Sequence, residues 1–214
     1  MAAPLGEEPR VAIATTYPEP AVLATAILLL AAPAMAAIAV AVRLDSPGPV
    51  LFVQRRVGLR GREFPMFKFR SMCMDAEQRL AGLAHLNVGG EHLIRIPSDP
   101  RVTRLGSLLR RTSLDELPQL LNVLRGDMSL VGPRPQSPAE VALYSSRERA
   151  RLEVPPGMTG LWQITARDTP SFDEWIRLDL EYLERWSLRL DLEILARTPG
   201  VVLRTAHRST GDMA

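Results

Sequence analysis

The feature that most constrains the fold is an apolar segment near the N-terminus. Residues 21–42 contain no charged side chain, and Thr25 is the one hydroxyl among them. As an α-helix, this segment would be about 33 Å long, which is enough to cross the hydrocarbon core of a bilayer. The sequence therefore predicts a helix inserted in a membrane.

Pro33 lies near the middle of this segment. A proline inside a helix removes one backbone hydrogen bond and costs about 3 kcal/mol. It divides the segment into two arms, each long enough to reach about halfway across a bilayer. Two interpretations stay open, a kinked span and a re-entrant helix that returns to the side it entered. Arg43, Arg55 and Arg56 follow the segment and favour a cytoplasmic position for the rest of the chain.

The flank that precedes the segment is acidic, with Glu7, Glu8 and Glu19 against Arg10. A secretory signal peptide carries positive charge there, so cleavage after the Ala34–Ala36 stretch is not expected.

Breaker residues at 45–49 mark a domain boundary. We expect a tail and membrane helix over residues 1–46 and a cytoplasmic catalytic domain over residues 47–214. The predicted fold class is α+β, mainly helical, with a short β-hairpin and amphipathic helices at the membrane surface. The expected strands are 50–57 and 63–70, and the expected helices are 72–86, 103–111, 114–125, 139–152, 172–186 and 190–206, the last interrupted near Pro199.

Charge is concentrated in the middle of the chain. The whole protein has a formal net charge of +2, but residues 55–70 carry six cations against Glu63 alone. Such a face suits phosphates, anionic lipids or nucleic acid. Aromatic residues make up only 5% of the chain, which argues against a nucleic-acid module.

A single cysteine, Cys73, excludes a disulfide-stapled fold.

Lys68 is the one lysine among 26 basic residues. Period-2 alternation on the strand 63–70 places Lys68 and Arg70 on one face, where they could clamp a phosphate. The alternative is a polar strand face turned to solvent.

Two adjacent carboxylates follow two arginines at 110–116. Ser113 and Glu116 have the spacing of a capping box, so Asp115 and Glu116 are expected at a helix N-terminus. An ionised aspartate there can act as a nucleophile, and a neighbouring glutamate can hold a divalent metal. The alternative is that both acids only cap the helix.

Two further residues stand out downstream. Arg134 lies between Pro133 and Pro135, which limits its conformational freedom and suits bidentate phosphate contacts. Asp179 falls in the apolar stripe of the helix 172–186, where a carboxylate is costly unless it is paired or functional. A structural ion pair with an arginine and a role at a substrate site are both open.

The chain resembles the monotopic bacterial phosphoglycosyl transferases, in their small single-domain form. The matching stretches are 67–72, 111–119, 127–135, 156–163 and 178–182. Members of that family have a re-entrant helix broken at a Ser-Pro pair; here Ala32 replaces the serine.

The resemblance implies transfer of a sugar 1-phosphate from a UDP-sugar to a polyprenol phosphate such as undecaprenyl phosphate, which releases UMP. It implies that Asp115 is the nucleophile and that Glu116, together with Asp115, holds Mg²⁺. Lys68 is expected among the catalytic residues. Residues expected to bind substrate are Arg110, Pro133, Arg134 and Asp179 from the family motifs, and Arg70 and Arg111 from their spacing.

The resemblance also places the catalytic domain on the cytoplasmic face of the bacterial inner membrane, in contact with lipids. No nucleic-acid partner is expected. A second copy of the chain and downstream glycosyltransferases are further partners to consider. The alternative function is a non-catalytic membrane adaptor that uses its basic face on anionic lipids.

Overall fold

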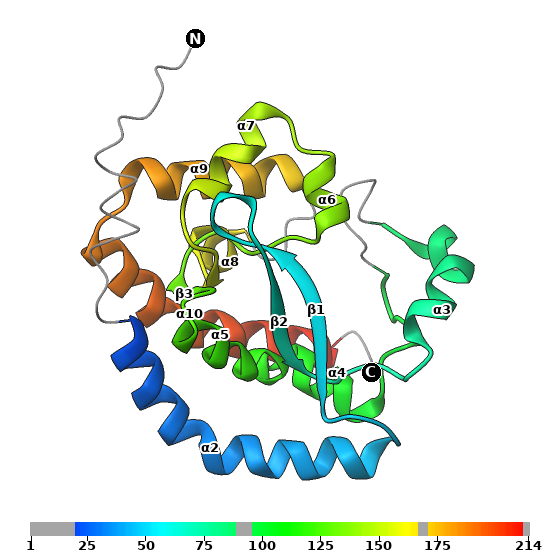
Figure 1. The fold of residues 1–214 in the computed structure, drawn as a ribbon. Coiled ribbons are helices and arrows are strands. Elements are labelled where there is room, and N and C mark those ends of the chain that lie inside the picture. Colours follow the sequence, from blue (N-terminus) through cyan, green and yellow to red (C-terminus); the bar gives the residue numbers. More distant parts are fainter. Residues whose placement is uncertain (1–19, 89–95, 167–170, 212–214) are drawn as a thin grey trace.

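The computed structural model describes residues 20–88, 96–166 and 171–211 (Figure 1). These residues form a mostly helical structure with one β-hairpin and an apolar N-terminal helix, as the sequence predicts. The division into residues 1–46 and 47–214 stays a prediction. Figure 1 shows α2 along one side of the molecule and α9 on the opposite side, with the hairpin between them.

Helix α2 (Pro20–Asp45) contains the apolar segment, and Figure 1 shows it bent along its length. Pro33 lies within it, where the lost backbone hydrogen bond allows a bend. Ala24 and Val42 are buried against the body, whereas Leu29 and Leu30 are 70% and 84% exposed. By length and composition, α2 could cross a membrane. Its exposed apolar side fits a membrane anchor.

The predicted hairpin is confirmed. Strands β1 (Leu51–Val57) and β2 (Glu63–Phe69) pair antiparallel, with Gln54 opposite Met66, and η1 (Leu59–Gly61) joins them. Phe64 and Met66 point into the main hydrophobic core.

Three predicted helices are broken into shorter pieces, and residues 114–125 give η3 (Leu114–Gln119) and α5 (Leu120–Leu124). Residues 72–86 give α3 (Ala76–Leu80) and η2 (Ala81–Leu86), and residues 139–152 give α6 (Pro138–Ala142), α7 (Ser146–Arg149) and η4 (Ala150–Glu153). Capping boxes at Ser137 and Ser145 begin α6 and α7 separately. A capping residue has non-helical backbone angles, so Ser145 ends any continuous helix through this region.

The other helices follow the sequence more closely. Helix α4 (Arg104–Arg111) is capped by the Thr103 side chain, and α9 (Phe172–Arg185) lies where it was expected. The expected interruption near Pro199 is wrong, because α10 (Leu188–Gly211) continues through it. Ile194 and Val201 pack on the main core on either side of Pro199, which holds both halves in line.

Three short elements were not predicted. Strands β3 (Ser129–Val131) and β4 (Gly157–Thr159) pair in parallel, and α8 (Leu161–Thr165) follows β4. A Cβ at Gly157 would lie 2.1 Å from the Gly132 nitrogen, so only glycine allows the two chains to approach this closely. Three-residue strands are too short to show a period in the sequence.

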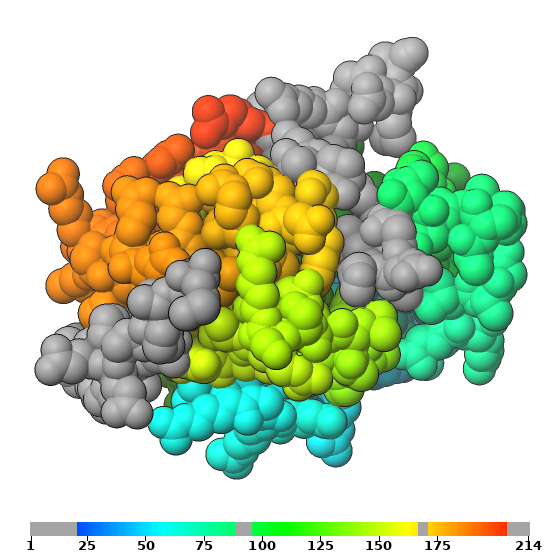
Figure 2. Space-filling model, turned by 90° about the horizontal axis from the view of Figure 1, so that it is seen from above, coloured from blue at the N-terminus to red at the C-terminus, as the bar shows by residue number. Residues whose placement is uncertain are grey.

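The main core joins β2, α5 (Leu120–Leu124), α8, α9 and α10. Trp162 and Trp175 stack within it, with ring centroids 4.4 Å apart. Figure 2 shows the face where α9 lies beside the segment 138–153, with the hairpin turn at the edge.

Candidate active site

The segment that carries both carboxylates is a 3₁₀ turn, η3 (Leu114–Gln119). Pro118 has no N–H to donate to Leu114, which prevents a regular α-helical turn here. Ser113 has a φ of 54° and makes no side-chain cap hydrogen bond. The predicted capping box is therefore wrong, and a turn this short has little dipole to stabilise an anion.

Asn122 fixes this turn against the hairpin. Its Oδ1 accepts from the Phe67 nitrogen at 3.0 Å, and its Nδ2 donates to the Pro65 carbonyl at 2.7 Å. Asn122 is fully buried, so it takes the place of a strand partner for β2. This bond pair places η3 alongside the end of β2 that carries Lys68.

Glu116 is held between two cations from different elements. Lys68 Nζ lies 2.9 Å from Glu116 Oε1, and Arg134 Nη2 donates to the same oxygen at 2.7 Å. Arg134 Nη1 lies 3.4 Å from Oε2, so the guanidinium engages both oxygens. Charge-assisted bonds of this kind are stronger and more directional than neutral ones. They fix the orientation of the Glu116 carboxylate.

These contacts decide the charge states of the group. Burial alone would raise the pKa of Glu116, but Arg134 and Lys68 hold it well below its usual range. Glu116 in turn raises the pKa of Arg134. Burial lowers the pKa of Lys68, and Glu116 opposes that shift. The contact with Glu116 thus stabilises the charged form of Lys68.

Asp115 is placed differently, although it is the adjacent residue. It is 7% exposed, and no side chain among the described residues donates a hydrogen bond to its carboxylate. Burial, assisted by the charge of Glu116, raises the pKa of Asp115 to about 6. Lys68, Arg110 and Arg134 oppose that rise from nearby. Its carboxylate oxygens are thus not held by any described side chain.

A family model described as "Bacterial sugar transferase" matches residues 19–205, which include every element of this site. The chain belongs to the bacterial sugar transferase family. The match begins just before the apolar helix, so that helix is part of the family's shared sequence.

Individual bacterial sugar transferases point the same way. Galactosyl transferase CpsE of Streptococcus agalactiae is 47% identical over 73% of this chain and 35% of its own length. Undecaprenyl-phosphate galactose phosphotransferase of Salmonella typhimurium is 42% identical over 83% of this chain and 38% of its own length. The chain thus spans less than two-fifths of either relative. It aligns with 82% of Exopolysaccharide production protein ExoY of Rhizobium meliloti, at 41% identity.

Arg70 does not join Lys68 at this site. Its guanidinium donates to the main-chain carbonyls of Ser46 at 2.6 Å and Pro47 at 2.8 Å. It also reaches the Val42 carbonyl at 3.3 Å, so it caps the C-terminal end of α2. The expected phosphate clamp of Lys68 and Arg70 is therefore wrong. Strand β2 ends at Phe69, and the open carbonyls of a helix end attract a buried cation.

Other predicted residues lie in different surroundings. Arg110 is exposed and acts on Asp115 through its charge, whereas Arg111 Nε and Nη1 are buried without a hydrogen-bond partner among the described residues. Pro133 accepts a hydrogen bond from the Gly157 nitrogen. Asp179 is 1% exposed and paired with Arg151. Of the two roles left open for Asp179, the structure shows the ion pair.

Sequence reasoning missed three charged residues around Arg134. Arg56 donates to the Pro135 carbonyl at 3.3 Å and lies 3.4 Å from Glu140 Oε2. Its side chain is half-buried, 15% exposed, and the cytoplasmic position that Arg56 was taken to favour stays a prediction. Arg151 contacts the Arg134 carbonyl. The spacing of Gln54 and Arg56 on one face of β1 could have indicated a role for Arg56, but no pattern distinguishes Arg151.

The carboxylates of Asp115 and Glu116 suit a magnesium ion that is bound together with substrate phosphates. No cluster of three or more acidic, histidine or cysteine side chains that could hold a metal is found among residues 20–88, 96–166 and 171–211. Asp115 nevertheless offers a buried carboxylate without a direct cationic contact, beside Glu116. Mg²⁺ is commonly bound by one or two carboxylates together with substrate phosphates and waters. The donor set therefore suits an ion that arrives with a diphosphate.

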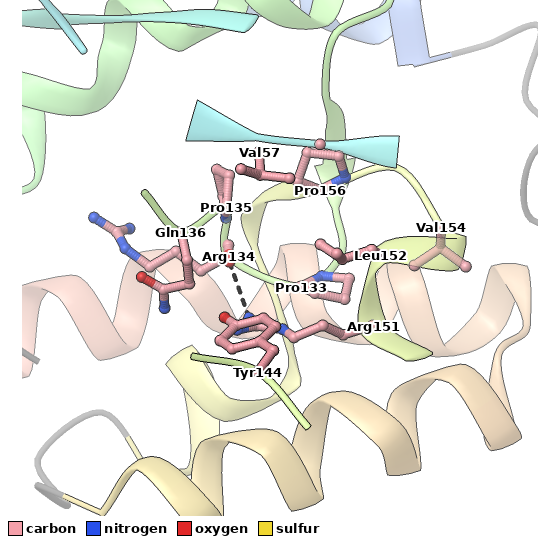
Figure 3. Close-up of a pocket in the computed structure, with 11 residues that line it drawn as sticks. Val57, Pro133, Arg134, Pro135, Gln136, Tyr144, Arg151, Leu152, Val154 and Pro156 are labelled. Atoms are coloured by element: carbon pink, nitrogen blue, oxygen red, sulfur yellow. Dashed lines mark hydrogen bonds between the residues drawn. The ribbon is translucent and has the colours of Figure 1, made fainter. Parts of the chain in front are cut away.

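A small hollow lies behind the loop that carries Arg134 (Figure 3). Its walls include Val57, Tyr144, Leu152 and Pro156. Figure 3 shows the Arg134 side chain extending away from Arg151, which reaches the loop from the other side.

Proposed function

We propose that this protein transfers a sugar 1-phosphate from a UDP-sugar to a polyprenol phosphate, which forms a polyprenyl-diphosphate sugar and UMP. The supporting observation is the pair of adjacent carboxylates in a bacterial sugar transferase: Asp115 buried and unbonded, Glu116 fixed by Lys68 and Arg134. Relatives named for undecaprenyl-phosphate galactose and glucose phosphotransfer support the substrate class.

In the proposed first step, an Asp115 oxygen attacks the donor phosphorus that bears the sugar. The bond from that phosphorus to the bridging oxygen breaks, and UMP leaves with the bonding electrons. In the second step, an oxygen of the polyprenol phosphate attacks the same phosphorus, and the Asp115 carboxylate is regenerated. Two displacements let one site serve a water-soluble donor and a lipid acceptor in turn.

The charged residues of the site have different roles in the proposed reaction. Lys68 and Arg134 hold Glu116 in one orientation and place two positive charges where the donor diphosphate would lie. Arg110 adds a third charge at the rim. Asp115 and Glu116 would hold Mg²⁺, which offsets diphosphate charge and favours departure of UMP when it is bound.

The membrane arrangement belongs to the same proposal. The exposed apolar side of α2 supports insertion in a membrane. The proposal is that this is the bacterial inner membrane and that the helix enters and leaves on the cytoplasmic side. A Leu5→Cys variant in a Cys73→Ser background tests it with a membrane-impermeant maleimide. Protection from periplasmic reagent is expected, and labelling from the periplasm would exclude the re-entrant arrangement.

The central experiment measures UMP release by the purified protein in detergent, with Mg²⁺, undecaprenyl phosphate and either UDP-glucose or UDP-galactose. Release with at least one donor is expected. Without the acceptor, the protein should gain the mass of one hexose phosphate, and hydroxylamine should remove it, as for an acyl phosphate. A folded protein that releases no UMP with any UDP-sugar would contradict the proposal and favour a membrane adaptor.

A further inference from the structure

The main chain around Arg134 is held at every carbonyl. Four consecutive carbonyls, from Pro133 to Gln136, each accept a hydrogen bond from a different donor. The donors are the Gly157 nitrogen at 2.9 Å, Arg151 Nη2 at 2.9 Å, Arg56 Nη1 at 3.3 Å and the Val57 nitrogen at 2.9 Å. Prolines on both sides of Arg134 remove two backbone degrees of freedom as well. The position from which the Arg134 side chain starts is thus fixed.

Arg151 is the donor to the Arg134 carbonyl itself, and its contacts are all inside the protein. Its other guanidinium nitrogen donates to the Tyr144 hydroxyl at 2.8 Å. Its charge is paired with Asp179. Arg151 and Asp179 are 3% and 1% exposed, so neither touches solvent or a substrate. Figure 3 shows Arg151 directed at the main chain of Arg134.

The buried Arg151–Asp179 ion pair is not explained by its contribution to the stability of the fold. Removing two charges from water costs several kcal/mol for each ion, and a well-packed apolar pair of similar volume is often as stable or more stable. Burial raises the pKa of Asp179 to about 6 in spite of the attraction of Arg151. Ionising Asp179 at neutral pH therefore costs folding free energy. What an apolar pair would lack is the fork of donors that Arg151 presents to Arg134 and Tyr144.

We infer that Arg151, oriented by Asp179, is a positioning residue that fixes the Arg134 main chain so that the Arg134 side chain meets Glu116. This inference rests on the proposed function for its kinetic consequences. It assigns Asp179 no contact with donor or acceptor. Asp179 acts two steps away, through Arg151 and then Arg134.

A double-mutant cycle with Arg134 tests this chain of contacts. Arg151→Met with Asp179→Leu replaces the ion pair by apolar side chains that can fill the same space. We expect kcat for UMP release to fall about 10-fold or more, with KM for the UDP-sugar changed less than about 3-fold. In an Arg134→Ala background, the same double change should lower kcat by less than about 2-fold. Equal losses in both backgrounds would overturn the inference.

Two milder variants keep the test valid if the double variant does not fold. Arg151→Lys retains the charge opposite Asp179 but cannot present a planar fork, so kcat should still fall. Tyr144→Phe removes the other hydrogen bond of Arg151 and leaves the bond to Arg134 intact, so kcat should stay within about 2-fold of wild type. Wild-type kcat in Arg151→Lys would contradict the positioning role.

Hydrogen exchange of the loop gives a readout that does not depend on catalysis. In the Arg151→Met, Asp179→Leu variant, amides in a peptide covering 131–138 should exchange faster, while those of β1 and β2 stay unchanged. Unchanged exchange in 131–138 would overturn the inference. Failure of the wild-type protein to release UMP would overturn the proposed function, and loop exchange would still decide the structural part.

Discussion

Two buried aspartates in this molecule, Asp115 and Asp179, differ mainly in their partners. Asp115 and Asp179 are 7% and 1% exposed, and burial raises the pKa of each to about 6. Asp179 has one arginine in direct contact and no access to solvent. Asp115 has three cations nearby, but no described side chain donates to it. The comparison separates a carboxylate in a buried ion pair from one that no described side chain holds.

The largest expected effect comes from Asp115→Asn. An amide cannot form the phospho-enzyme, so UMP release should fall by about 10⁴-fold, while the thermal midpoint stays equal or rises. Rate and thermal unfolding are measured on the same preparation. Asp75→Asn, at an exposed pair with Arg79, serves as the control and should keep wild-type activity. Substantial activity in Asp115→Asn would remove the distinction between the two aspartates.

Asp179→Asn should have its main effect on stability. It leaves the Arg151 charge buried without a counter-charge, which lowers the free energy of unfolding by about 3–5 kcal/mol. Urea denaturation in detergent, followed by tryptophan fluorescence, measures this loss. The same measurement on Asp115→Asn should show no loss. Equal destabilisation by both variants would mean that Asp115 is also a structural carboxylate.

Lys68→Arg tests whether activity requires the compact ammonium group of Lys68 or only its positive charge. The change keeps the charge but replaces a compact ammonium, 2.9 Å from Glu116 and 15% exposed, by a larger planar group. We expect kcat to fall about 10- to 100-fold. Arg62→Lys, an exposed change on the same hairpin, is the matched control and should be neutral. Wild-type rates for Lys68→Arg would show that only charge matters at that position.

The smallest expected effect is on the pH dependence of stability. Because each folded-state pKa, about 6, lies above the unfolded value near 3.8, the folded protein binds protons more tightly. The free energy of unfolding should therefore rise by about 1 kcal/mol as pH falls from 7.5 to 5.5 without Mg²⁺. Asp115→Asn should reduce this rise. A flat profile in the wild type would contradict the raised pKa values.

Much of the architecture follows from local patterns in the sequence. The apolar run, the alternation of the hairpin and the stripe of α9 each repeat over enough residues to reveal their element. The breaks at Ser113 and Ser145 do not follow from periodicity, because one backbone turn ends a helix without changing the apolar pattern around it. The parallel pairing of β3 and β4 depends on a close approach of Gly132 and Gly157, which are 25 positions apart in the chain.

Some residues of the candidate site could likewise be predicted from the sequence, and others could not. Asp115, Glu116, Lys68 and Arg134 lie in dense motifs, and resemblance to a family could point to them. The pairing of Arg151 with Asp179 is set by how η4 packs on α9, which no local pattern encodes. For Arg70, a local pattern gave a wrong prediction, because strand alternation placed its side chain beside Lys68. In the structure, its guanidinium instead binds the carbonyls at the end of α2.

The contact of Arg70 with the end of α2 has a consequence for the proposed reaction at a membrane. Arg70 ties the last turn of α2 to the strand that carries Lys68 two residues earlier, without a linker between them. Together with the packing of Ala24 and Val42 on the body, this contact fixes the position of the carboxylates relative to α2. In the proposed reaction, the phosphate of a polyprenol acceptor would have to reach carboxylates held at that position, so the depth at which α2 inserts would determine which acceptors can react.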